Sequence, residues 1–120
     1  MIKLYKHFIY SWQIDFDRQG GEELIGALQS ALSNEEKVLK INYLDKKGER
    51  IIDLVFINDE ITYNVVLTKS KLSIEMDREE IEDAIERFGE SIEIKYFYPA
   101  EFYQGKMGKN TISITAAYKE

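Results

Sequence analysis

The chain has 120 residues, of which 22 are acidic and 16 basic, giving a net charge of −6, and it contains no cysteine. Its length fits one domain, residues 1–120, that is large enough to bury a hydrophobic core. The absence of cysteine excludes a disulfide scaffold, a thiol nucleophile and a cysteine-ligated metal, and it suits a cytoplasmic location. The acidic balance argues against nucleic acid as a partner, because phosphate contacts require a basic surface. No run of about 20 apolar residues is present, so we expect no membrane span.

The first part of the chain predicts one long strand followed by a helix. Residues 4–16 alternate between apolar and polar positions, as in a strand with one buried face. Gly20 and Gly21 interrupt this pattern. We interpret them as a turn and not as a phosphate-binding loop, because two glutamates follow where phosphate would bind. Apolar residues at helical spacing then predict a helix over residues 22–32.

The middle of the chain predicts four consecutive strands, most simply arranged as an antiparallel meander. A glycine-containing hairpin connection separates the first two strands, and short polar turns separate the others. The predicted strands span residues 37–44, 51–57, 61–67 and 72–76.

The last part of the chain predicts a second helix. Asp77 and Glu80 form a D-x-x-E variant of the capping box at its N-terminus, and Gly89 is expected to end it. The segments that follow are expected to be a strand, a loop and a strand over residues 92–98, 100–110 and 111–118.

A five-residue pattern occurs twice, once at each predicted strand-to-helix junction. Residues 14–18 read IDFDR and residues 74–78 read IEMDR. Aligned on these junctions, the order β-α-β-β-β-β-α-β-β suggests two duplicated β-α-β-β units around a middle strand. We therefore predict an α+β fold: a single-domain two-layer sandwich of about seven mostly antiparallel strands with two helices on one face.

Few residues offer catalytic or metal-binding chemistry. His7 is the single histidine, and a histidine without a nucleophile motif or further ligands supports neither catalysis nor a metal site. Carboxylates gather around the two junctions, where paired acids could cleave glycosides or hold magnesium. Helix capping explains most of these acids, so we predict no catalytic residue, no metal and no cofactor.

The candidate partner-binding residues combine aromatic side chains with junction carboxylates. Consecutive aromatics near the single proline must point to both faces of a sheet, so some of them should reach the surface, where tyrosine is enriched at binding hot spots. A place at the sheet edge or in a second core is the alternative for the same side chains. The candidate residues are Tyr98, Phe102, Tyr103, Asp15, Asp17 and Glu75.

Functions from different classes remain open. Small size, acidity and aromatics beside carboxylates favour a non-enzymatic protein-binding module, such as a bacterial immunity or inhibitor protein that covers a basic surface of its partner. The alternative is a small-ligand binder or enzyme with a composite site at a homodimer interface. That alternative predicts a deep pocket lined by His7, Trp12 or the junction carboxylates. An assembly component is a third hypothesis, distinguished by concentration-dependent oligomerisation.

Overall fold

The computed structural model describes residues 1–60, 62–95 and 100–120. It confirms an α+β fold with two helices, and eight strands lie in the part of the chain that it describes. In chain order the elements are β1 (Ile2–Phe8), β2 (Ser11–Phe16), α1 (Arg18–Leu32), β3 (Leu39–Asp45), β4 (Gly48–Asn58), β5 (Val65–Leu67), β6 (Lys71–Met76), α2 (Arg78–Ile94), β7 (Ala100–Met107) and β8 (Asn110–Tyr118). Within the described ranges, neither helix has the length and apolar character needed to cross a membrane.

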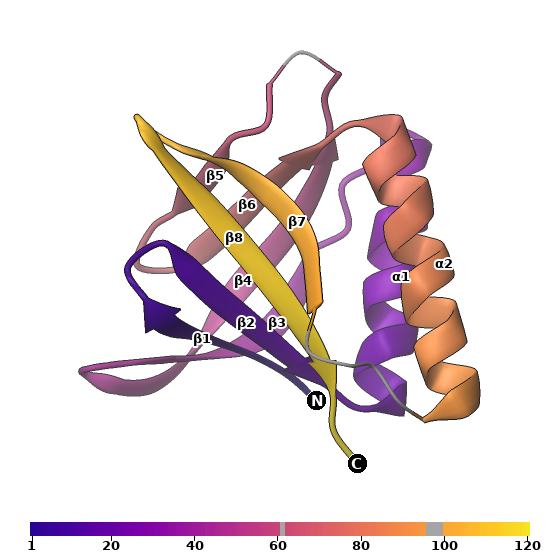
Figure 1. Ribbon diagram of the computed structural model, residues 1–120, viewed down its shortest axis with the longest axis horizontal. Helices are drawn as coiled ribbons and strands as arrows, with labels where there is room; N and C mark the ends of the chain where they lie inside the picture. The colour runs from indigo at the N-terminus through magenta and orange to yellow at the C-terminus, as the bar shows by residue number, and fades with distance from the viewer. Residues whose placement is uncertain (61, 96–99) are drawn as a thin grey trace.

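The strands form one mixed sheet that curls into a nearly closed barrel, with both helices along one side (Figure 1). The strand order is β5-β6-β4-β3-β1-β2-β8-β7. Four neighbouring pairs are antiparallel, whereas β1–β3, β4–β6 and β2–β8 are parallel. The two ends of the sheet approach each other where Asn64 forms a bridge with Lys106 of β7. A curled mixed sheet thus replaces the predicted sandwich of seven mostly antiparallel strands, and the predicted meander is wrong because β4 pairs with β6 and not with β5.

The N-terminal segment that the alternation predicted as one strand is a hairpin. β1 pairs antiparallel with β2, and the chain turns at Ile9 and Tyr10. Neither turn residue is a glycine, proline, asparagine or aspartate, the usual sequence signals of a turn. A register shift between Lys6 and Phe8 adjusts the pairing near the turn. Period-two alternation alone therefore could not locate the break.

The second helix is longer than predicted. Gly89 lies inside α2, which ends at Lys95 in the left-handed conformation with φ of 56°. The strand predicted over residues 92–98 begins inside this helix, and its later residues lie outside the described part of the chain. The loop predicted over residues 100–110 is mostly strand β7, which pairs with β8.

The first helix begins earlier than predicted, because Asp17 caps it and both glycines belong to its first turn. A Cβ atom on Gly20 would lie 2.1 Å from the Met1 carbonyl oxygen. A Cβ atom on Gly21 would lie 3.0 Å from the Ile92 side chain of α2. The glycine pair is therefore not a turn of its own. It lets α1 approach the N-terminus and the neighbouring helix closely.

The chain consists of two halves with the same order of elements, β1-β2-α1-β3-β4 and β5-β6-α2-β7-β8. Each half begins and ends with an antiparallel strand pair, and the halves join through the parallel pairs β4–β6 and β8–β2. The repeated five-residue pattern marks equivalent junctions, β2 to α1 and β6 to α2. The structural unit is ββαββ, however, so the predicted β-α-β-β unit lacked one strand, and the predicted middle strand overlaps β5, the first strand of the second half.

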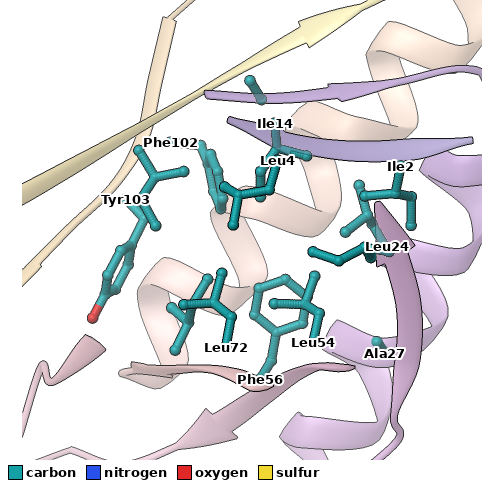
Figure 2. Packing of buried hydrophobic residues seen from close by; sticks show 14 of the residues in the cluster. Ile2, Leu4, Ile14, Leu24, Ala27, Leu54, Phe56, Leu72, Phe102 and Tyr103 are labelled. Carbon is teal, nitrogen blue, oxygen red and sulfur yellow. The ribbon is translucent and has the colours of Figure 1, made fainter. Parts of the chain in front are cut away.

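One hydrophobic core joins both halves and both helices (Figure 2). Phe88 of α2 packs edge-to-face against Phe16 of β2 at a centroid distance of 5.0 Å and against Phe102 of β7 at 5.4 Å. Trp12 is fully buried, and its indole N–H donates to the Ile9 carbonyl at 3.1 Å. Burying each of these large side chains stabilises the fold by about 1.5–3 kcal/mol. The core therefore fixes the position of α2 and of the β1–β2 turn.

Candidate functional site

The aspartates of the two junctions cap helices. Asp17 Oδ1 accepts the Gly20 N–H at 2.8 Å, and Asp77 Oδ1 accepts the Glu80 N–H at 2.8 Å. Asp17 Oδ1 also pairs with the N-terminal ammonium at 2.8 Å. This contact first, and the Gly20 hydrogen bond second, hold the pKa of Asp17 below its usual value. Capping is confirmed at both junctions, so both carboxylates have structural roles.

The structure places Asp15 and Glu75 on opposite sides of the barrel. They occupy equivalent positions on β2 and β6, and three strands separate β2 from β6 in either direction around the sheet. Glu75 accepts hydrogen bonds from the Thr62 hydroxyl and the Asn64 N–H. The predicted carboxylates therefore do not meet in one site.

Two of the predicted aromatic anchors are core residues. Phe102 is 7% exposed and Tyr103 is 2% exposed. The Tyr103 hydroxyl donates to the Glu75 backbone carbonyl, and burial raises its pKa. These two side chains do not project as surface anchors, and the core position considered as the alternative is correct for them. Tyr98 lies outside the described residues.

His7 belongs to a hydrogen-bonded network on the outer side of β1 and β2. Its Nε2 lies 2.7 Å from Gln13 Oε1, and Gln13 Nε2 donates to Asp15 Oδ1 at 2.6 Å. The Tyr5 hydroxyl donates to the same carboxylate at 3.3 Å, and burial together with the Asp15 charge raises the pKa of Tyr5 to about 12. An amide separates the imidazole from the carboxylate, so Asp15 does not orient His7 as a catalytic base.

The described residues also contain no group of three or more histidine, aspartate or glutamate side chains that could hold a metal ion. The network around His7 therefore offers neither a metal site nor an activated base. Its hydrogen bonds and the edge-to-face contact of Tyr5 with His7, at a centroid distance of 5.1 Å, hold the side chains of β1 and β2 in fixed positions.

A cleft of about 730 Å³ opens between the tips of two hairpins, β1–β2 and β3–β4. We call it the hairpin cleft; residues 5–9 line one side and residues 43–47 line the other. β1 and β3 pair in parallel only as far as Tyr5 and Leu44, after which the strands diverge. In Figure 1 both hairpin tips lie on the side of the barrel opposite the helices. The volume of the hairpin cleft falls in the range of ligand pockets.

The helix α2 and its N-cap concentrate negative charge. The segment 77–94 holds eight of the 22 acidic residues and two of the 16 basic ones, so its net charge of −6 equals that of the whole chain. Six of the acids are exposed, at spacings that place them on one side of the helix. We call this surface the α2 acidic face: Glu79, Glu82, Asp83, Glu86, Glu90 and Glu93.

An open hollow borders the α2 acidic face where α2 lies next to β7. The buried residues Phe102 and Tyr103 are among its lining residues. Burial raises the pKa of Glu80 on its rim, against the lowering effect of the hydrogen bond from the Asp77 N–H. The charged residues of the lining are Asp77, Glu80, Asp83, Arg87 and Glu101. A mainly acidic lining is suited to a lysine or arginine side chain.

No protein-family model and no curated protein matches the chain. Function must therefore be argued from its surfaces. Sequence reasoning missed the hairpin cleft, although two signals of it are local: the apolar run at residues 8–10 and the basic pair Lys46 and Lys47. The missing information was that β1 and β3 are parallel neighbours, which brings these two segments together.

Proposed function

We propose that this chain is a non-enzymatic protein-binding module that covers a basic surface of a partner protein with the α2 acidic face. The observation that carries the proposal is the charge distribution: the segment 77–94, α2 with its N-cap, bears a net charge equal to that of the whole chain. A single-sign surface on a rigid helix attracts an oppositely charged partner and orients it before contact.

The arrangement of these acids costs stability, which supports a role outside folding. Like charges three or four residues apart on a helix destabilise it by about 0.2–0.5 kcal/mol per pair. Glu90 and Glu93 lie near the C-terminal end, where the helix dipole disfavours negative charge, and the last turn has no basic residue. Among the described residues, Arg78 forms an ion pair with Glu82 at 2.8 Å. A helix selected for stability alone would alternate the signs of its charges.

The hollow beside α2 supplies a place for one basic side chain of the partner. The buried Tyr103 lines the hollow, and the Tyr63 hydroxyl donates to Asp77, another lining residue, at 3.1 Å. A lysine or arginine that enters the hollow would meet carboxylates without their having to move. Such pre-organisation lowers the entropy cost of binding.

Small inhibitors of basic enzymes would use this chemistry, and we place the chain in that class. An immunity protein that blocks a bacterial toxin is the specific case: its acids would occupy positions that the substrate's negative charges otherwise take.

The test compares two variants that change the net charge equally. One carries Glu82→Gln, Glu86→Gln and Glu90→Gln on the acidic face; the control carries Glu35→Gln, Glu36→Gln and Glu120→Gln. A partner captured from lysate of the native cells is purified, and its dissociation constants are measured at low and at physiological salt. We expect the acidic-face variant to bind at least tenfold more weakly and the control to bind like the wild type. A partner that binds both variants equally, or no partner at all, would refute the proposal.

The hairpin cleft favours a second function, binding of a ligand remote from α2. The composite-site alternative predicts a pocket lined by His7, Trp12 or the junction carboxylates. The lining of the hairpin cleft includes His7, whereas Trp12 is fully buried. If a homodimer completed the site, light scattering would give twice the monomer mass. Phe8→Ser at the cleft would then lower the measured mass. A monomer at all concentrations would remove this alternative.

A further inference from the structure

The seam between β1 and β3 opens toward the hairpin tips and leaves an edge of β1 uncovered. β1 pairs with β2 from Ile2 to Phe8, with a register shift between Lys6 and Phe8, but it pairs with β3 only as far as Tyr5. Among the described strands, residues 6–8 therefore lie beside β2 but have no pairing with β3. Exposed strand edges are templates for an additional strand, and addition of an extended peptide to such an edge is a recurring mode of recognition.

Apolar side chains next to this edge are exposed although their backbone is fixed. Phe8 is 77% exposed and Ile9 is 69% exposed. The turn that carries them is held by Trp12, which donates to the Ile9 carbonyl at 3.1 Å, and by Ser113, whose N–H donates to the Tyr10 carbonyl at 3.0 Å. The exposed side chains are therefore presented from a fixed turn, which reduces the entropy cost of contact with a partner.

The charge around the cleft is opposite to that of α2. Lys6, Lys46 and Lys47 line the cleft together with one acid, Asp45. Asp45 already pairs with Arg50 at 2.7 Å. Lysines on a strand edge also protect it from aggregation, but this protection does not account for the exposed apolar side chains beside them. An apolar floor with a basic rim is complementary to a chain that alternates apolar and acidic residues.

We propose that the hairpin cleft binds an extended peptide segment of alternating apolar and acidic residues, which adds as a short strand to residues 6–8 of β1. Its apolar side chains would contact Phe8, Ile9 and Leu44. Its carboxylates would face Lys46 and Lys47. This surface lies on the side of the barrel opposite α2 (Figure 1), so the inference is independent of the function proposed for the acidic face.

The probe is a set of synthetic, end-blocked octapeptides in which glutamate alternates with a mixture of valine, isoleucine and phenylalanine. Fluorescence anisotropy measures binding to the intact chain, and amide hydrogen exchange follows residues 6–8. We expect binding at least tenfold tighter than that of the same peptides with lysine in place of glutamate. We also expect slower amide exchange at residues 6–8 in the complex.

Backbone methylation tests whether the peptide binds as a strand. Two complementary versions carry N-methyl groups on the odd or on the even residues, because alternate N–H groups of a strand face opposite neighbours. If the peptide pairs with β1, at least one version loses binding. Binding of both versions as tight as that of the unmethylated peptide would overturn strand addition.

Matched protein variants test the location. Lys46→Glu with Lys47→Glu should abolish binding, whereas Lys109→Glu with Lys119→Glu changes the net charge equally at exposed positions outside the cleft lining and should not. A second cleft variant, Phe8→Ser with Ile9→Ser, removes only exposed side chains and should weaken binding at least tenfold while the circular dichroism spectrum stays unchanged. Equal binding by cleft and control variants would overturn the proposal. So would failure of every peptide, including the case in which the chain instead sediments with phosphatidylglycerol vesicles.

Discussion

Asp17 and Asp77 perform the same task in the two halves of the chain. Each caps the helix that follows it, and each accepts the backbone N–H three residues downstream at 2.8 Å. Their surroundings differ, because Asp17 also binds the N-terminal ammonium and Asp77 is part of a complete capping box with Glu80. Substitutions at Asp17 and Asp77 therefore distinguish the stability that a helix cap contributes from the stability that neighbouring groups add.

Replacing Asp77 by alanine should lower the free energy of unfolding by about 0.5–2 kcal/mol, since the Glu80 N–H loses its acceptor. Asp77→Asn keeps an acceptor and should recover most of the loss. Urea unfolding followed by circular dichroism measures both changes. An alanine variant as stable as the wild type would show that the cap contributes nothing.

The ion pair of Asp17 should make stability depend on pH in the acid range. The folded-state pKa of Asp17 is lowered, so its stabilising effect is present above the usual aspartate pKa and is lost as the pH falls through the folded value. The pair is partly exposed, so its contribution is about 1 kcal/mol or less. We therefore expect Asp17→Asn to be less stable than the wild type at pH 7, and the difference to shrink as the pH falls below the usual aspartate pKa. A difference that does not change with pH would contradict this assignment.

Two glycines of the helices should respond to alanine in opposite directions. Gly20→Ala would place a Cβ atom 2.1 Å from the Met1 carbonyl oxygen, so the N-terminal strand or the helix must shift, at a cost of about 1–3 kcal/mol. A Cβ atom on Gly89 would have no heavy atom within 4 Å, so Gly89→Ala should raise stability by about 0.5–1 kcal/mol. Thermal unfolding compares the two variants directly. Destabilisation by both would mean that Gly89 has a role beyond its helix.

Local signals in the sequence were sufficient to predict the two helices, although not their ends, and they were not sufficient for the sheet. The cap at Asp77 and the apolar stripe of α2 were readable because both depend on residues three or four positions apart. Gly89 was misread as a helix end, because the actual stop is Lys95 in the left-handed conformation, which its sequence does not signal. The parallel pairs β4–β6 and β2–β8 join segments distant in the sequence, and no local pattern specifies them.

The candidate surfaces also differ in whether a local sequence pattern reveals them. The acids of α2 follow helical spacing, so a negatively charged helix face could be inferred from the chain alone. Asp15 and Glu75 were grouped because their sequence contexts match, but equivalent positions in two halves of a barrel lie on opposite sides. Phe102 and Tyr103 were expected in a loop, where exposure is the rule, and strand β7 turns both into the core.

The buried hydroxyl of Tyr103 should contribute measurably to stability. It donates to the Glu75 backbone carbonyl across the strands β7 and β6, near the ends of the sheet that almost meet. Tyr103→Phe leaves that carbonyl without its donor, which costs about 1–3 kcal/mol. Tyr10→Phe, at an exposed position, is the matched control and should change little. Chemical denaturation gives both values, and equal stability of the two variants would show that the hydrogen bond is replaced by water.

The acids at the C-terminal end of α2 should show a trade between stability and binding. Glu93→Gln removes a negative charge from the end of the helix where the dipole opposes it, so we expect stability to rise by about 0.3 kcal/mol or more at low salt. The gain should shrink as salt screens the charge. In the same variant, a basic partner should dissociate faster or associate more slowly, because the acidic face is one charge weaker.

Glu79→Gln, at the other end of the helix, is the control: it also weakens the face, but it removes a favourable dipole interaction and should lower stability. If Glu93→Gln neither stabilises the chain nor weakens partner binding, the acids of α2 are ordinary surface charge.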